Sequence, residues 1–384
     1  MDYSKKLDEL LLTTARQNAS DLHLAVGRYP TLRIDGALIP LAKESVLNPE
    51  AVEGLVSALL TPEQKEKFLK EKEIDFTYAF EDKARFRANV YYQRGFMAAA
   101  LRFIPAQIKT IEELSLPSML HDFTKLSQGF VLLVGPAGHG KSTTLAAIID
   151  EINHNQTNHI ITVEDPVEYL FAQDKSIISQ REVGLDTNDF HNALRSVLRQ
   201  DPDAIMIGEM RDAESIATAL TAAETGHLVF STLHTNNASG ALPRLLDMGA
   251  EPYLLASSMT AIVAQRVGRK IHEKCKVAYE PDPKIMTDMK NILGPLWPQD
   301  RDGKLYKGQG DTECGDTGYL GRVGLFEVLP VSEKISSLIL QRSSASEIEK
   351  VAREEGMITL KQDGYLKVLE GITTIDEVLR VAQE

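Results

Sequence analysis

A glycine-rich segment that ends in lysine and serine has the composition of a phosphate-binding loop. Residues 135–142, GPAGHGKS, fit the pattern GxxxxGKS, follow the apolar run FVLLV and lead into the helix-forming sequence STTLAAIIDEI. In such a loop, glycines let successive backbone N–H groups face phosphate oxygens, and the following helix N-terminus adds partial positive charge. The lysine bridges the β- and γ-phosphates and the serine ligates Mg²⁺. Since the flanking strand and helix disfavour a chance glycine-rich turn, we predict a nucleotide-binding site made by Gly135, Pro136, Ala137, Gly138, His139, Gly140, Lys141, Ser142 and Thr143, with Ser142 also on Mg²⁺.

Two glutamates stand where such an enzyme needs carboxylates near the metal and the attacking water. These groups usually end an apolar strand next to the phosphate loop. Glu209 ends the run DAIMIGE and Glu164 ends IITVE, so both are predicted at the carboxyl edge of a sheet. Carboxylates at strand ends also cap the next helix, which is the structural alternative for each. Two such positions together with the phosphate loop favour hydrolysis of the bound nucleotide.

Two histidines bracket another apolar run, TGHLVFSTLHT. His227 opens the predicted strand and His234 closes it, at an end where a polar side chain can reach a γ-phosphate. Histidine is suited to this task because small changes in its surroundings move its charge across neutral pH. A single histidine is more often a structural hydrogen-bonding residue, and this alternative stays open for both.

The order of apolar runs indicates the architecture that positions these residues. FVLLVG, HIITVED, DAIMIGE and HLVFSTLH alternate with helix-forming segments, which is typical of a parallel sheet with crossover helices. The predicted fold class is therefore α/β over residues 118–384. Within it we expect an irregular insert at 272–322 and a helical tail at 331–384, broken at Gly356, Gly364 and Gly371.

A different pattern precedes this region. Leu7, Leu10, Leu11 and Ala15 share one helical face. Residues 47–72 predict two helices, with Thr61 as the N-cap of the second. Short alternating runs such as IDFTYAF and ARFRANVYYQR predict strands, and Asp35-Gly36 predicts a hairpin turn. We predict a small α+β domain over residues 1–105 and a linker over 106–117, which begins after Pro105.

Composition limits the class of protein and of partner. The chain has 384 residues, with 42 Lys and Arg against 55 Asp and Glu, and a formal net charge of −13. Such a surface repels polyanions on average, so neither nucleic acid nor an anionic membrane is expected as the main partner. Two cysteines exclude a disulfide framework and fit a reducing, cytoplasmic compartment. The chain shows neither a signal-peptide pattern nor about 18 consecutive apolar residues, so we expect membrane association only through protein partners.

Four motifs in order resemble those of the type II/IV secretion ATPase superfamily. GPAGHGKSTTLAAIID, ITVEDPVEY, LRQDPDAIMIGEMRD and TGHLVFSTLHT are similar to its Walker A, acidic, atypical Walker B and histidine boxes. The type IV pilus motors look most similar, from about Ala19 to the C-terminus. The resemblance implies a hexamer whose subunits join an N-terminal PAS-like domain to a C-terminal RecA-like ATPase. It also implies a location at the cytoplasmic face of the inner membrane, on a pilus platform protein.

The resemblance further implies roles for single residues. Lys141 and Ser142 would hold the phosphates and Mg²⁺. Glu209 would polarise water, Glu164 would be the second carboxylate near metal and water, and His234, more than His227, would sense the γ-phosphate. Arginines in matching stretches of the family reach the nucleotide site, where such a group raises the rate about 10³- to 10⁵-fold. The matching positions, each of which could instead form a surface salt bridge, are Arg87, Arg94, Arg102, Arg195 and Arg199.

Two branches of the pilus motors are mixed in this chain. Residues 20–36, 85–95 and 208–212 resemble retraction motors, which lack the extra N-terminal domain of assembly motors. Residues 242–271 and the segments after them resemble the assembly and type II secretion branch, and the retraction tail motif AIRNLIRE has no match. Retraction, with twitching motility, is slightly preferred because the N-terminal domain is minimal, and assembly or type II secretion stays open.

The assembly branch also carries a zinc module of two CxxC pairs. The corresponding positions here hold His272, Cys275, Asp311 and Cys314, which keep the spacing. All four side chains can ligate zinc, although aspartate is an unusual structural ligand. The hypothesis is a Cys₂HisAsp zinc site, and the alternative is a loop that kept its shape while losing its metal.

Two functions of other classes remain to be weighed against an ATPase motor. A RecA-type nucleic-acid translocase is disfavoured by the net charge of −13 and by the absence of a basic run with interleaved aromatic residues. A scaffold that binds nucleotide without hydrolysing it is disfavoured by the complete set of phosphate-binding and carboxylate residues.

Overall fold

Two compact units make up the chain in the computed structural model, which describes residues 2–17, 19–34, 36–80, 84–104, 107–299 and 303–382. The first comprises Met1–Ile108 with Pro166–Leu170, and the second comprises Lys109–Asp165 and Phe171–Glu384. Each unit has its own cluster of buried apolar side chains. The domain limits proposed from the sequence stay predictions, and Pro105 lies outside the described residues.

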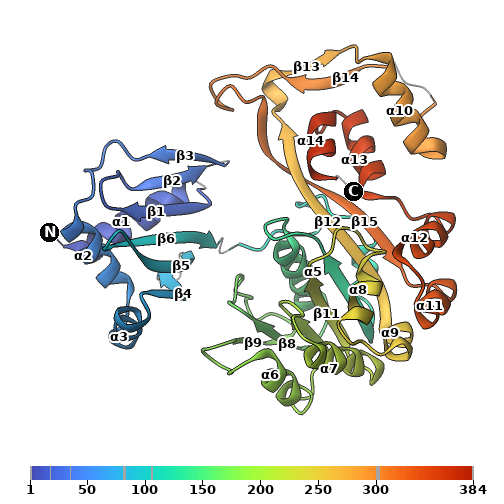
Figure 1. Ribbon diagram of the computed structural model, residues 1–384, viewed down its shortest axis with the longest axis horizontal. Helices are drawn as coiled ribbons and strands as arrows, with labels where there is room; N and C mark the ends of the chain where they lie inside the picture. The colour runs from blue at the N-terminus through green and yellow to red at the C-terminus, as the bar shows by residue number, and fades with distance from the viewer. Residues whose placement is uncertain are drawn as a thin grey trace. The chain divides into compact units, whose positions relative to one another are not determined.

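The first unit combines an antiparallel sheet with three helices (Figure 1). The sheet has the strand order β3-β2-β1-β6-β5-β4. Leu7, Leu10 and Leu11 are buried along one face of the first helix, as their spacing predicts. A capping box between Thr61 and Gln64 starts the third helix. The elements are α1 (Tyr3–Arg16), β1 (Asp21–Ala25), β2 (Thr31–Ile34), β3 (Ala37–Pro40), α2 (Pro49–Leu59), α3 (Pro62–Glu71), β4 (Glu73–Phe80), β5 (Ala84–Gln93) and β6 (Phe96–Ile104).

The helices and strands predicted for this part of the chain are thus confirmed, while the limits of the small α+β domain stay a prediction. The strands β2 and β3 pair antiparallel with Ile34 opposite Ala37, and Gly36 has the positive φ of +86° that a tight turn requires. Asp35 of the predicted hairpin dipeptide lies outside the described residues.

A seven-stranded sheet forms the centre of the second unit, in the order β15-β12-β7-β11-β10-β8-β9 (Figure 1). All neighbouring pairs are parallel except β12 with β15. The four strands predicted from apolar runs are confirmed as β7 (Gly129–Val134), β8 (His159–Glu164), β10 (Ala204–Ile207) and β11 (Leu228–Leu233). Their near-continuous apolar sequence fits strands that are buried on both faces.

The other strands of this sheet were not predicted. They are β9 (Ile177–Glu182), β12 (Met259–Ile271) and β15 (Tyr319–Pro330), and the helices around the sheet are α4 (Leu120–Phe123), α5 (Lys141–Asn155), α6 (Phe190–Val197), α7 (Ala213–Glu224), α8 (Ala241–Asp247), α9 (Pro252–Ser258), α11 (Glu333–Leu340), α12 (Ala345–Glu354), α13 (Leu360–Leu369) and α14 (Ile375–Val381). Among the described residues, none of the helices is both long and apolar enough to cross a membrane.

Two expectations for the C-terminal half are wrong. The insert is not irregular throughout, because between its loops and before the start of β15 its described residues form η1 (Glu273–Cys275), β13 (Lys276–Tyr279), α10 (Pro283–Leu293), η2 (Gly294–Leu296) and β14 (Leu305–Gly308). Gly364 does not break the tail but lies inside α13, where an added Cβ would come within 2.6 Å of Val378 on α14. The glycine therefore serves close helix packing. Gly356 and Gly371, with φ of +99° and +71°, do end helices.

A buried ion-pair cluster attaches the last helix to the sheet. The side chain of Glu377 on α14 is 2% exposed and accepts hydrogen bonds from the backbone and side chain of Arg269 on β12, at 2.8 and 2.7 Å. Arg380 donates two more, at 2.9 and 2.6 Å. Burial alone would raise the pKa of Glu377, but the hydrogen bonds from both arginines outweigh it and lower the pKa to about 2.

Replacing Glu377 with glutamine is expected to lower the free energy of unfolding by about 2 kcal/mol near pH 7, a value discounted because both arginines are half exposed. The folded-state pKa lies below the unfolded one, so the stabilisation is present above pH 4.5 and is lost as pH falls toward 2. Denaturant unfolding should therefore separate Glu377→Gln from wild type at pH 7 and much less near pH 2. Exposed Glu370→Gln is the control, and an equal difference at both pH values would contradict the assignment.

Candidate functional site

The residues predicted to bind and hydrolyse ATP meet at one edge of the second sheet. The strands β7, β11, β10 and β8 are parallel neighbours, so their carboxyl ends lie side by side. The phosphate loop follows β7, Glu164 ends β8, Glu209 comes two residues after β10, and His234 directly follows β11. Strand order therefore brings together groups that are up to about a hundred residues apart in the chain.

The loop between β7 and α5 has the conformation that an anion site requires. Gly138 and Gly140 adopt positive φ values of +77° and +80°. Gly140 is the N-cap residue of α5 and supplies no capping side chain, so the first N–H groups of this helix are available to a ligand. Ser142 and Thr143 are partly exposed in that first turn. The loop thus has the backbone geometry of a phosphate cradle, and the binding of nucleotide by its residues stays a prediction.

Lys141 is folded into this loop. Its side chain is buried, and Nζ donates to the backbone oxygens of Gly135 at 2.7 Å and Pro136 at 3.0 Å. The loop carbonyls therefore hold the ammonium group at the base of the cradle. Phosphate oxygens offer the same lysine a stronger, charge-assisted hydrogen bond.

The two carboxylates at this edge have different surroundings. Glu164 is 6% exposed and accepts hydrogen bonds from Thr162 Oγ1 at 2.6 Å and Gln180 Nε2 at 3.3 Å. Glu209 is more accessible, and one of its oxygens is bound by Arg211 Nε. Its other oxygen lies 3.3 Å from His234 Nε2.

Arg211 is a functional candidate that the sequence reasoning missed. Besides Glu209 it contacts Asp165, with Nη1 at 3.2 Å from Oδ2, so it links the residues that follow β8 and β10. Together Glu209, His234 and Arg211 form one hydrogen-bonded group beside the phosphate loop. A basic residue two positions after the carboxylate, in GEMRD, was the available signal.

Three predicted site residues of the second unit lie at the opposite edge of its sheet. His227 stands at the amino end of β11, and its Nδ1 is 2.9 Å from the backbone oxygen of Ala222. Arg195 lies in the last turn of α6, and Arg199 lies shortly before β10. Both arginines are exposed. The structure therefore does not bring these three to the phosphate loop of the same chain.

The remaining predicted arginines belong to the first unit. Arg87 on β5 is the cross-strand neighbour of Arg102 on β6, and both are exposed. Arg102 Nε is 3.1 Å from Asp21 Oδ1. Arg94, with φ of +50°, lies in the turn between these strands and is exposed. The three are thus surface groups of one sheet and its turn.

Strand β12 contributes polar residues that the sequence reasoning did not identify. Gln265 and Arg266 are 3% and 4% exposed, and Arg266 donates to the backbone oxygen of Asn236 at 2.5 Å, just after His234.

Glu327 on the neighbouring strand β15 accepts from the N–H groups of Ala238 and Leu360, at 2.7 and 3.3 Å. Burial raises the pKa of Glu327, which these two hydrogen bonds and Arg266 oppose. In the sequence, the only indication that these residues are buried was their position as polar residues within apolar runs.

A second cluster of ligand-type side chains lies at the end of β12. The ligand atoms of His272, Cys275, Asp311 and Cys314 all lie within 4.8 Å of one another. His272 Nδ1 is 3.0 Å from Asp311 Oδ2 but outside hydrogen-bond geometry, so this buried nitrogen has no hydrogen-bond partner among the described residues. Cys314 Sγ accepts backbone N–H groups from Asp311 at 3.2 Å and Gly318 at 3.3 Å. The fold therefore assembles the four predicted ligands.

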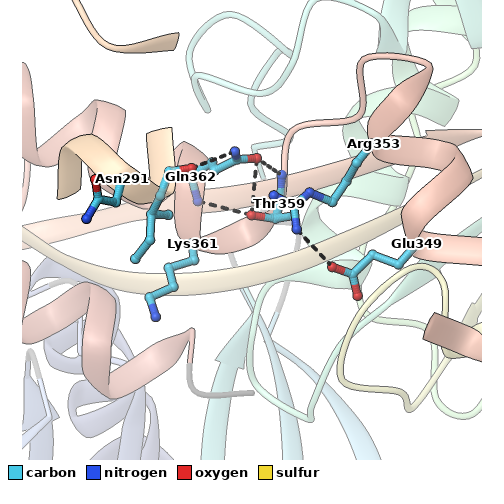
Figure 2. A pocket seen from close by; sticks show the side chains of 7 residues that line it. Asn291, Glu349, Arg353, Thr359, Lys361 and Gln362 are labelled. Atoms are coloured by element: carbon cyan, nitrogen blue, oxygen red, sulfur yellow. Dashed lines mark hydrogen bonds and ion pairs between the residues drawn. The ribbon is translucent and has the colours of Figure 1, made fainter. Parts of the chain in front are cut away.

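A polar hollow of about 260 Å³ lies away from both sites, among α10, α12 and α13 (Figure 2). Its wall includes an ion pair of Arg353 with Glu349, at 3.8 Å. Gln362 closes it by accepting the Thr359 N–H at 3.0 Å and donating to Ile292 at 2.9 Å. The first of these hydrogen bonds caps α13 and the second joins α13 to α10, which gives Gln362 a structural role.

Comparisons with known proteins agree with this geometry. The family described as Type II/IV secretion system protein matches residues 4–380. The type IV pilus retraction ATPase PilT of Pseudomonas aeruginosa is 41% identical over 69% of this chain and 78% of its own length. The assembly ATPase PilB of Thermus thermophilus is 36% identical over 94% of this chain. Type II secretion system protein E of Xanthomonas campestris is 46% identical over 67% of this chain. The chain spans 41% of that PilB and 44% of that protein E.

Solved structures lead to the same conclusion. The pilus retraction motor PilT with bound ADP is 35% identical and superposes with a TM-score of 0.78, over 97% of this chain and 96% of its own. The ATPase DotB of Legionella pneumophila, at 23% identity and a TM-score of 0.74, shares the fold. The predicted α/β fold and the predicted resemblance are confirmed. The chain belongs to the type II/IV secretion system protein family.

Proposed function

We propose that this protein is an ATP-hydrolysing motor subunit that powers type IV pilus dynamics, with retraction and twitching motility favoured. The observation that carries the proposal is the meeting of the phosphate loop, Glu164, Glu209 and His234 at one sheet edge. Similarity to the retraction motor PilT over nearly all of both chains supports retraction. Similarity to PilB and to type II secretion protein E keeps pilus assembly and secretion as second candidates.

ATP is the nucleotide that the loop is proposed to bind. Lys141 exchanges its contacts with the loop carbonyls for the β- and γ-phosphates, and the N–H groups of the loop and of the first turn of α5 face the phosphate oxygens. The donor set at this edge, a serine hydroxyl and two carboxylates, consists of the hard oxygen ligands that suit Mg²⁺. Ser142 would hold this ion with Glu164 near it, and the bound ion would neutralise phosphate charge.

Glu209 is the proposed group that polarises the attacking water. Glu209 is hydrogen-bonded to His234 and Arg211. A bound γ-phosphate can compete with Glu209 for these two side chains. His234 then exchanges its contact with Glu209 for the phosphate when ATP is bound and returns after hydrolysis. The loop after His234 would move with this change of hydrogen-bond partner and transmit it to the rest of the unit.

A hexameric ring is proposed as the working form. His227, Arg195 and Arg199 lie at the edge of the second sheet opposite the phosphate loop. The first unit carries exposed arginines at positions 87, 94 and 102. Exposed arginines of this kind are able to complete the site of another copy, and such a contribution makes hydrolysis depend on ring geometry. We place this ring at the cytoplasmic face of the inner membrane, held there by a pilus platform protein, with no role for nucleic acid.

Deleting the gene tests the direction of work. Excess pili with loss of twitching motility are expected for a retraction motor, whereas loss of pili would assign the chain to assembly. ATP turnover by the purified protein tests the enzyme class itself. Stimulation of that turnover by DNA would favour the translocase alternative over a pilus motor.

We further propose that His272, Cys275, Asp311 and Cys314 hold a zinc ion. The buried Nδ1 of His272, which has no hydrogen-bond partner among the described residues, fits a metal ligand. The two N–H groups on Cys314 Sγ are contacts of the kind that stabilise a metal-bound thiolate. Two sulfurs, one nitrogen and one carboxylate oxygen match the ligands of four-coordinate zinc. A closed structural site would tie the loop after β12 to the loop after β14.

Purified protein is expected to contain zinc in an equimolar amount by elemental analysis. Cys275→Ala should lose the metal because the site drops to three protein ligands. Chelation should lower the melting temperature of wild type and leave that of Cys275→Ala unchanged. Exposed Glu280→Gln, next to the site in sequence, should retain the metal. Metal-free wild type whose melting temperature does not respond to chelator would refute the site.

A further inference from the structure

Strand β12 packs directly against the phosphate loop. It runs parallel to β7 with Ala264 opposite Val134, so the next residue, Gln265, comes beside Gly135 at the start of the loop. An added Cβ on Gly135 would collide with the backbone oxygen of Gln265, and one on Gly140 would lie 2.9 Å from Gln265 Nε2. Gly135 and Gly140 therefore allow close approach of β12, in addition to the approach of phosphate that a glycine-rich loop permits.

The side chain of Gln265 reaches the helix that follows the loop. Its Oε1 accepts a hydrogen bond of 2.8 Å from Thr144 Oγ1 on α5, and both residues are buried, at 3% and 1% exposure. This bond spans 121 residues of sequence. A buried amide oxygen that loses such a donor remains desolvated, which gives the bond a large effect on local geometry.

A second bond from β12 holds the middle of the loop. The N–H of Val267 donates to His139 Nδ1 at 2.9 Å, which requires the neutral imidazole with its proton on Nε2. Burial, with Arg266, Lys141 and Arg380 nearby, lowers the pKa of His139 and favours that neutral form. The residues 265–267 thus contact the loop at its start, its middle and its junction with α5.

We infer that Gln265 is a positioning residue for ATP binding, which acts through Thr144 to hold the loop and the first turn of α5 in the phosphate-binding conformation. The inference rests on the proposed ATP site. It also explains why a polar side chain is buried in an otherwise apolar strand. Because the loop binds substrate and transition state alike, losing its preorganisation should raise KM for ATP more than it lowers kcat.

Three variants test this hydrogen bond from both sides. Gln265→Met and Thr144→Val remove the bond at similar volume, and each is expected to raise KM about tenfold with kcat changed less than about threefold. Thr144→Ser keeps the hydroxyl and should restore the wild-type KM. The double variant of Gln265→Met and Thr144→Val should be no worse than either single variant, because both remove one bond.

Gln362→Met is the matched control for burial of a glutamine. This residue is 8% exposed in the same unit and caps α13 away from the loop (Figure 2), so its variant should leave KM unchanged even where it lowers stability. Unchanged KM in Gln265→Met, or a Thr144→Ser that behaves like Thr144→Val, would overturn the inference. A wild-type chain that neither binds nor hydrolyses ATP would instead overturn the proposed function, before any variant is compared.

Discussion

Replacing Glu209 with glutamine is expected to abolish most ATP turnover while leaving ATP binding close to wild type. The amide has the same shape and still accepts a hydrogen bond from Arg211 or His234, but it cannot take a proton from water. Loss of such a group costs about 10²- to 10⁴-fold in rate. Phosphate release measures the turnover, and calorimetric titration with ATP measures the binding.

The control for this prediction is Glu224→Gln. Glu224 is exposed at the last position of α7, so the same chemical change there should leave both measurements unaltered. Retained turnover in Glu209→Gln would show that Glu209 does not polarise the water and would leave Glu164 as the candidate for that role. Loss of binding together with turnover would show that Glu209 instead shapes the empty site.

Replacing Lys141 with alanine is expected to weaken ATP binding by at least about a hundredfold and to make turnover undetectable. The ammonium group supplies charge-assisted hydrogen bonds that no other side chain of the loop provides. In the structure the same group bridges the oxygens of Gly135 and Pro136, so its loss also frees the loop. Calorimetric titration with ATP and phosphate release measure the two effects.

Exposed Lys350→Ala on α12 controls for the loss of one positive charge. A melting curve separates lost binding from lost folding, because Lys141→Ala should still unfold cooperatively near the wild-type temperature without nucleotide. ATP should then stabilise wild type and Lys350→Ala but not Lys141→Ala. Equal stabilisation of all three by ATP would contradict the proposed phosphate site.

The strands that carry the site could be predicted because their signals are local. FVLLV and HLVFSTL are apolar runs of strand length, FVLLV flanked by glycines and HLVFSTL by Gly226 and His234, and GPAGHGKS combines glycine conformations with the start of a helix. Neither depends on what lies elsewhere in the chain. Placing Glu164, Glu209 and His234 at the carboxyl edge followed from the same logic, since parallel strands present their carboxyl ends together.

The strands and turns that the sequence left unassigned depend on their partners. The run AIVAQRVGRKI contains Gln265, Arg266 and Arg269, which break an alternating pattern, yet pairing with β7 and β15 makes it part of the 13-residue strand β12. Gly364 looks like a helix breaker until α14 packs against it. In both cases tertiary packing overrode the local preference.

By itself the sequence determined the phosphate loop, the two carboxylates Glu164 and Glu209, the histidine His234 and the four residues spaced as zinc ligands, because each is a short pattern with its own chemistry. Only the tertiary structure decided which polar groups support them. Strand order placed Arg211 and His234 on Glu209, Gln265 on the loop, and His227 at the far edge of the sheet. The physical reason is that these contacts join residues far apart in the chain, and their pairing is set by the packing of whole strands and helices rather than by local sequence.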